Sequence, residues 1–258
     1  MDAVARDALE VAHQTIRACL ERCSDQTTAF PGALVCRTRT LPEVWTLNQV
    51  RVTEPADPDA VAELAQQHQA DLAFRHLVIE DPATGAAAEA LLAAQDGWRV
   101  EHDVVMRLGD RRPASRSGID VVELSVPEML ELMSCWFSQQ HPDVTADTAA
   151  QLSEYQRREH RAFDEQIFGV RDTHGTALGL TKLRMVGEVA WVEDVFTRPE
   201  ARRRGFARAL VTRAVLAALE LSPVLVFLEA DADDWPQHLY ADLGFEPLAP
   251  CTILHRTG

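Results

Sequence analysis

The feature that most constrains the fold is an order of predicted elements that occurs twice along the chain. In the first half, two β-rich runs precede a helix, a strand, a helix and a closing strand pair, at 33–41, 44–53, 57–69, 74–81, 84–95 and 97–108. In the second half the same order runs through 175–185, 188–198, 203–220, 224–230, 236–243 and 244–256. A shift of 147 residues places Gly97 and Trp98 on Gly244 and Phe245. We therefore predict a duplicated fold of the α/β (α+β) class.

The polar segment "GDRRPASRSG", residues 109–118, is typical of a linker between the two copies. We therefore predict two domains, 1–113 and 114–258, and the length of 258 residues fits two domains of about 100 to 150 residues each. A helix over 1–24 is expected to open the first domain. A strand over 119–125 and helices over 126–140 and 146–160 are expected to open the second.

The composition is that of a soluble globular protein, with 47% hydrophobic and 25% charged residues. No apolar run approaches the roughly 20 residues that span a bilayer, and the first residues are acidic where a secretory signal would be basic and then apolar. We therefore expect a cytoplasmic protein without a membrane partner. Of the five cysteines only Cys19 and Cys23 share a helix face, and no second Cys or His pair completes a metal site. Buried thiols are favoured over a metal ion.

A formal net charge of −15 disfavours nucleic acid as a partner, because such binding relies on clustered positive charge. Against this background residues 198–213 contain six arginines and one glutamate. The first turn of a helix leaves backbone N–H groups unpaired and a partial positive charge. Gly205 allows close approach of the backbone, and the arginines before it add full charges. The stretch predicts a diphosphate cradle, and an arginine-rich solvated face with an incidental glycine is the alternative.

With these residues the second half resembles the GNAT superfamily of acyl-CoA-dependent N-acyltransferases, over roughly 115–258. The diphosphate motif of that family, [Q/R]-x-x-G-x-[G/A], is met by Arg202, Gly205 and Ala207. The strand end before it is met by "FTRP", and the family's later Y-x-x-x-G-F motif by Tyr240, Gly244 and Phe245. The resemblance implies two GNAT-like domains, each with a mixed, mostly antiparallel sheet flanked by helices.

The resemblance also implies acetyl-CoA as co-substrate. A strand that splays from its neighbour, often at a β-bulge, would bind the pantetheine arm through the main chain of Val195, Phe196 and Thr197. The diphosphate would lie against Arg202, Arg203, Arg204, Gly205, Phe206, Ala207 and Arg208.

Transfer to an amine requires a base, because an alkylammonium with a pKa of about 10.4 is mostly protonated at neutral pH. Glu193 precedes the cradle and is the candidate base, with an ordinary ion-pairing acid as the alternative. Asp194 is expected on the opposite face of the sheet, because strand side chains alternate. Tyr240 matches the family's usual proton donor to the leaving thiolate, with a packed aromatic as the alternative.

Two features depart from the family pattern. Asp233 and Pro236 stand where many members have Asn and Ala before the tyrosine. In the first half "PADPDA" aligns with "RRRGFA" and Ala93 with Tyr240, so residues 1–113 are predicted to be a degenerate copy. The leading function is N-acetyltransfer to a small-molecule or peptide amine, and the alternative is a non-catalytic CoA-binding or regulatory module. The sequence carries no signal for the oligomeric state.

Overall fold

The structure is a computed structural model that describes residues 2–114 and 118–257, without the side chain of Asp164. It divides into two compact units. Unit 1 takes in the chain up to Val105, together with Glu229–Gln237 and the end of the chain from Pro247. Unit 2 takes in Met106–Leu228 and His238–Glu246. The predicted linker, 109–118, lies partly outside the described residues, at 115–117.

Unit 1 is a sheet with strand order β1-β2-β3-β4-β11-β5. The pair β3–β4 is parallel, and β1–β2, β2–β3 and β4–β11 are antiparallel. The strands are β1 Gln26–Phe30, β2 Ala33–Arg37, β3 Val50–Val52, β4 Phe74–Ile79, β5 Trp98–Leu108 and β11 Phe245–Thr257. The helices are α1 Ala3–Cys23, the 3-10 helix η1 Trp45–Leu47, α2 Pro58–His68 and α3 Pro82–Leu92.

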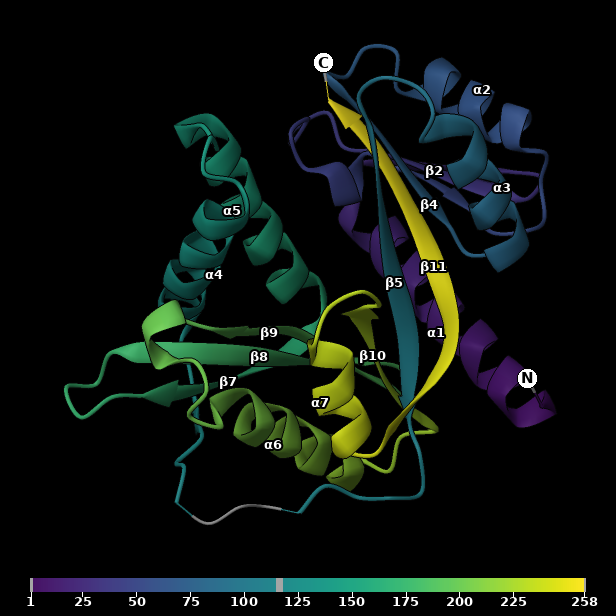
Figure 1. The fold of residues 1–258 in the computed structure, drawn as a ribbon. Coiled ribbons are helices and arrows are strands. Elements are labelled where there is room, and N and C mark those ends of the chain that lie inside the picture. The colour runs from purple at the N-terminus through teal and green to yellow at the C-terminus, as the bar shows by residue number, and fades with distance from the viewer. Residues whose placement is uncertain (1, 115–117, 258) are drawn as a thin grey trace. The chain divides into compact units, whose positions relative to one another are not determined.

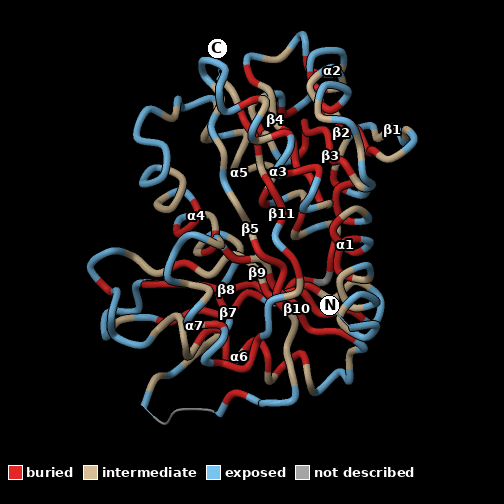
Figure 2. The backbone as a smooth tube through the Cα atoms, turned by 45° about the vertical axis from the view of Figure 1, so that its right-hand side comes forward, coloured by how far each residue is buried: buried red, intermediate tan, exposed pale blue. Residues whose placement is uncertain are grey.

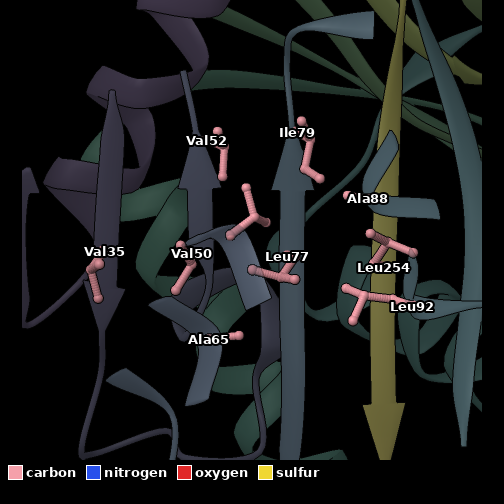
Figure 3. Packing of buried hydrophobic residues seen from close by; sticks show 10 residues of the cluster. Val35, Val50, Val52, Ala65, Leu77, Ile79, Ala88, Leu92 and Leu254 are labelled. Atoms are coloured by element: carbon pink, nitrogen blue, oxygen red, sulfur yellow. The ribbon is translucent and has the colours of Figure 1, made fainter. Parts of the chain in front are cut away.

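The core of unit 1 lies between this sheet and helices α2 and α3 (Figure 3). Val50, Leu77 and Leu254 come from three neighbouring strands, and each is completely buried. Both helices begin at an aspartate followed by proline. The Asp57 and Asp81 side chains accept hydrogen bonds from first-turn N–H groups, which is why each helix starts there.

Unit 2 has strand order β10-β9-β8-β7-β6, with β9–β10 parallel and the other pairs antiparallel. Helices α4 and α5 cover one face of β7–β9 and α6 covers the other (Figures 1 and 2). The strands are β6 Val122–Glu123, β7 Asp164–Arg171, β8 Ala177–Val186, β9 Val189–Thr197 and β10 Leu225–Asp231. The helices are α4 Val126–Gln140, α5 Ala146–Ala162, the 3-10 helix η2 Pro199–Ala201, α6 Phe206–Glu220 and α7 Pro236–Asp242.

The duplicated order is visible in the pairing of the strands. β2-β3-α2-β4 in unit 1 and β8-β9-α6-β10 in unit 2 share one plan, an antiparallel pair followed by a parallel pair across a helix. This confirms the predicted α/β (α+β) class. The predicted closing strand pair at 97–108 was wrong, because this segment is the single strand β5. Strands β1 and β7 were not predicted.

The last strand, β11, pairs with a strand of the first half of the chain. Its residues Thr252–Thr257 pair with Ile79–Phe74 of β4, and Leu254 is buried in the core of unit 1. The compact units therefore do not follow the order of the chain. The division into domains 1–113 and 114–258 stays a prediction.

Two sequence expectations concern metal sites and membrane-spanning segments. Cys19 and Cys23 are both buried, and no cluster of three or more His, Cys, Asp or Glu side chains suited to a metal is found in the described residues. No helix in the described ranges is long and apolar enough to cross a membrane.

Candidate functional site

Strand β9 contains the bulge that the family resemblance implies. Leu180 of β8 pairs with Phe196 and Lys182 pairs with Glu193, so the single residue Thr181 lies opposite both Asp194 and Val195. The Thr181 hydroxyl donates a hydrogen bond of 3.0 Å to the Glu193 carbonyl. Such an insertion leaves a residue out of the ladder and bends the strand.

β9 also loses its other neighbour at this point. The parallel pairing with β10 covers only Val189–Trp191 with Leu225–Phe227, whereas β9 continues to Thr197. In the described part of the chain, the edge of β9 beyond Trp191 has no partner residue in β10. Its backbone N–H and C=O groups are therefore available to an extended ligand.

Helix α6 follows β9 through a turn with two unusual residues. Arg203 has a φ of +61° and Gly205 a φ of +84°, and α6 begins at Phe206 rather than at the predicted residue 203. Gly205 is the N-cap, and no side chain caps the helix. A Cβ at Gly205 would meet only Ile119 Cδ1 at 3.6 Å, so the left-handed backbone rather than space favours glycine here. The first-turn N–H groups, including that of Ala207, are left for a ligand.

The arginines in and beside this turn differ in the contacts of their side chains. Arg202 donates to the Thr197 carbonyl at 3.2 Å and to Gln139 Oε1 at 3.0 Å, and Arg208 pairs with Asp242 at 2.8 Å. The Arg204 guanidinium lies 4.8 Å from the centre of the Phe206 ring.

Two of the arginines keep their charge uncompensated. Arg203 and Arg204 are exposed, and neither forms an ion pair with a described carboxylate. Their charges add to the partial positive charge of the helix end, so the turn suits a doubly charged anion such as a diphosphate.

Phe196 anchors β9 to the helical layer above it. Its ring is 3% exposed and stacks on Trp136 of α4, with 5.7 Å between ring centres and an interplanar angle of 10°. Val195 and Thr197 are half-buried. The strand is thus fixed by one side chain while the main chain of these three residues remains at the open edge.

The expectation that Asp194 lies on the opposite face from Glu193 was wrong. Asp194 has a φ of +52°, and the bulge breaks the alternation of side chains. Its carboxylate lies 2.8 Å from Lys182 Nζ, and the Glu193 carboxylate lies 2.9 Å from Arg184 Nη2. Lys182 and Arg184 are two residues apart on β8 and share one face. Both carboxylates therefore lie on the face that α4 and α5 cover.

Glu193 and Asp194 belong to a cluster of six charged side chains, here called the charge cluster, which the sequence analysis did not identify. Its members are Glu159, Glu165, Lys182, Arg184, Glu193 and Asp194. Arg184 is at its centre, 2.6 Å from Glu165 Oε1 and 3.0 Å from Glu159 Oε1. The sequence signal that could have indicated this cluster is "TKLRM", in which two cationic residues alternate with apolar residues inside a buried strand.

The charge cluster changes the proton affinities of its members. Burial raises the pKa of Glu193 well above its ordinary value, Arg184 opposes this change, and the carboxylates of Glu159 and Asp194 add to it. Burial lowers the pKa of Lys182, but the nearby carboxylates, Asp194 first among them, outweigh burial, so this pKa is raised and the ammonium persists. A Glu193 that is protonated more readily than usual can take a proton from a substrate.

Tyr240 comes from α7 and is 6% exposed, with its ring edge toward Phe245 at 6.3 Å between ring centres. Burial alone raises the pKa of its phenol, so the group keeps its proton at neutral pH. In the described residues no hydrogen bond or ion pair joins Tyr240 to Glu193. The two predicted catalytic residues thus come from separate elements of unit 2.

Asp233, one of the departures from the family pattern, is engaged within unit 1. Its carboxylate lies 3.2 Å from His102 Nδ1, and Glu89 lies 3.0 Å from His102 Nε2. The hydrogen bond to Glu89, with that to Asp233, raises the pKa of His102. Pro236, the other departure, is the first residue of α7.

Comparisons with known proteins agree with this geometry. The family model described as "Acetyltransferase (GNAT) family" matches residues 126–245, and a comparison with curated protein sequences found no match. Among solved structures the chain is similar to a GCN5-related N-acetyltransferase from Kribbella flavida, with a TM-score of 0.61 and 19% identity over 100% of this chain and 97% of that one.

Two further solved structures are similar in fold. A GNAT-family protein from Novosphingobium aromaticivorans is 25% identical, with a TM-score of 0.50 over 79% of this chain and 83% of that one. A tandem GNAT protein from the clavulanic acid biosynthesis pathway is 17% identical, with a TM-score of 0.56 over 87% and 78%. The bulged strand, the glycine-capped helix and the family match all fall within one segment. The chain therefore contains a GNAT-family acetyltransferase domain, at residues 126–245.

Proposed function

We propose that this chain is an N-acetyltransferase that moves an acetyl group from acetyl-CoA to a primary amine by direct attack in a ternary complex. The observation that carries the proposal is the succession of an open, bulged β9 and the uncapped, arginine-rich start of α6. The main chain of Val195–Thr197, on the edge of β9 that has no partner residue in β10, suits an amide-containing arm, and the turn at Arg202–Gly205 suits a diphosphate. The pantetheine arm and the diphosphate are adjacent parts of CoA, and the two features that suit them follow one another along the chain.

The chemistry would be divided between the chain and its co-substrate. Acetyl-CoA supplies the acetyl group as a thioester. Glu193, at the bulge, would accept a proton from the substrate ammonium directly or through a water molecule. Tyr240, which holds its proton at neutral pH, would donate it to the departing thiolate. The acceptor would be a small-molecule or peptide amine.

The first half would act as a degenerate copy of the same fold. Its helix α2 corresponds to α6, but the N-cap is Asp57 instead of a glycine, and its carboxylate accepts from the N–H of Asp59. A carboxylate already placed at a helix start repels a diphosphate and occupies the donors that would bind it. We propose on this basis that residues 1–113 hold no CoA and that residues 114–258 carry the activity.

Calorimetric titration of acetyl-CoA tests the cradle. In Gly205→Glu a negative side chain replaces the cap at a left-handed backbone position, so we expect affinity to fall at least tenfold relative to the wild type. Gly187→Glu is the matched control, because Gly187 also has a positive φ, of +58°, in an exposed turn with no atom within 4 Å of an added Cβ. Equal binding by wild type and Gly205→Glu would place the cofactor elsewhere.

A non-catalytic CoA-binding or regulatory module is the second candidate. The engagement of Glu193 by Arg184 favours it, because an ion pair of this kind also occurs as a purely structural contact. Release of CoA thiol in the presence of amines separates the two candidates. Binding of acetyl-CoA without acetyl transfer to any amine would support the module.

A further inference from the structure

The charge cluster presents only its carboxylates to solvent. The side chains of Glu193 and Asp194 are 22% and 21% exposed, whereas those of Lys182 and Arg184 are 0% and 1% exposed. Each cation lies behind the carboxylate that it pairs with. A molecule that reaches this part of β9 from solvent therefore meets two neighbouring negative groups and no accessible cation of the charge cluster.

Carboxyl groups also outnumber cations within the charge cluster, with four against two. Glu165 is fully buried, and its Oε2 atom has no hydrogen-bond partner among the described residues. His160 Nδ1 lies 3.7 Å from that atom. Uncompensated carboxylates in a buried setting are unfavourable unless a cation joins them.

The ion pairs of the two outer carboxylates each involve one oxygen. Lys182 contacts Asp194 through Oδ2, and Arg184 contacts Glu193 through Oε2. In the described residues no hydrogen bond is made to Asp194 Oδ1 or Glu193 Oε1. Without the bulge, alternation would send the Asp194 side chain to the face that α6 covers. The left-handed backbone of Asp194 thus places a second acceptor oxygen beside that of the proposed base.

We propose that Asp194 is a specificity-determining residue that binds a second cationic group of the acceptor, so that the preferred acceptors are small amines with two or more ammonium groups. This inference rests on the proposed function, in which Glu193 accepts the proton of the amine that reacts. One ammonium faces Glu193, and the other faces Asp194 and balances charge that Lys182 alone does not neutralise. An acceptor with one amine and an otherwise neutral chain loses this second contact.

The test compares binding of α,ω-diamines of three to six carbons with binding of monoamines of the same chain length. Each is titrated calorimetrically into the full chain saturated with CoA, so that the readout does not require acetyl transfer. We expect at least one diamine to bind the wild type tenfold or more tightly than its monoamine. In Asp194→Asn this ratio should fall below about threefold.

Asp194→Asn suits this purpose because asparagine accepts a left-handed backbone as readily as aspartate does, so the bulge is retained. Glu188→Gln is the matched control, since it removes one carboxylate from an exposed position in the turn before β9. It should leave the diamine preference intact. A melting temperature of Asp194→Asn close to that of the wild type establishes that the variant is folded.

The outcomes separate this inference from the proposed function. If diamines bind tightly through Asp194 and no acetyl transfer follows, the inference holds and the enzymatic function fails. If monoamines are acetylated and no diamine is preferred, the function holds and the inference is overturned. The inference is also overturned if Asp194→Asn weakens monoamine and diamine binding equally, or if no diamine of the series binds.

Discussion

Glu193 combines a raised pKa with a side chain that is partly exposed to solvent, and its replacement is the most direct test of its role. In Glu193→Gln we expect kcat/KM for acetyl transfer to fall about 10²- to 10⁴-fold, because the base is lost while the shape is kept. A base works only when deprotonated, so the wild-type rate should rise with pH through the Glu193 pKa. Burial places that pKa above the ordinary glutamate value. The measurement is kcat/KM against pH for both proteins.

Ionisation of the substrate provides the internal control for this profile. The alkylammonium has a pKa of about 10.4, and its limb should appear in both the wild type and Glu193→Gln. The limb at lower pH should appear only in the wild type. A variant that keeps both limbs and most of its rate would assign Glu193 to the ion pair with Arg184 alone.

Tyr240 can be tested with a change that retains its packing. Tyr240→Phe removes the hydroxyl and keeps the ring beside Phe245, so acetyl-CoA affinity should stay within about twofold of the wild type. We expect kcat to fall at least tenfold, because the leaving thiolate loses its proton donor. The measurements are the acetyl-CoA affinity and the kcat of both proteins. An unchanged kcat would leave Tyr240 as a packed aromatic residue.

At the residue scale, the sequence indicated the motif positions but not their charged surroundings. Gly205 and the arginines are adjacent in sequence, so their meeting at one helix start needed no tertiary information. Arg184, Glu159 and Glu165 come from three different elements, and only packing brings them to Glu193. The side to which Asp194 points depends on one backbone angle, which the period-two rule for strands does not contain.

At the element scale, the segment between β10 and α7 is tied to unit 1 by His102, which lies between Glu89 and Asp233. These partners raise the pKa of His102, so the stabilisation is present below the unfolded value of about 6.5 and is lost as pH rises through the folded value. We therefore expect His102→Gln to lower the melting temperature by a few degrees near pH 5.5 and by less near pH 8.5.

The control for this prediction is His174→Gln, at an exposed position in the turn before β8. Its effect on melting should be small at both pH values. A deficit of His102→Gln that stays constant with pH would mean that the histidine acts through packing rather than through its charge.

Elements with local signals were predicted well, and those that depend on partners were not. Helices α2 and α3 carry an aspartate and a proline at their starts, and both were predicted. β1 is a short strand whose residues are largely exposed, so it lacks an apolar signal. β5 is a single strand of 11 residues, longer than most strands, where a strand pair was predicted.

At the scale of the whole molecule, the pairing of β11 with β4 makes the fold of the second half of the chain depend on the first half. Residues Thr252–Thr257 pair with β4, and Leu254 is completely buried in the core of unit 1. No feature of β11 itself indicates this partner, because an apolar strand suits either sheet. The sequence repeat predicted two copies of one plan correctly but contained no information on which copy each last strand completes.

Expression of residues 114–258 without the first half tests this dependence. We expect no cooperative thermal unfolding, because β11 loses the backbone bonds to β4 and Leu254 alone loses burial that contributes about 1.5 to 3 kcal/mol. Such losses are large beside the 5 to 15 kcal/mol that stabilises a typical domain. Co-expression with residues 1–113 should restore a single transition by circular dichroism, since both strands are then present. A sharp transition of 114–258 alone would show instead that the second half closes its own sheet and that β11 has an alternative partner.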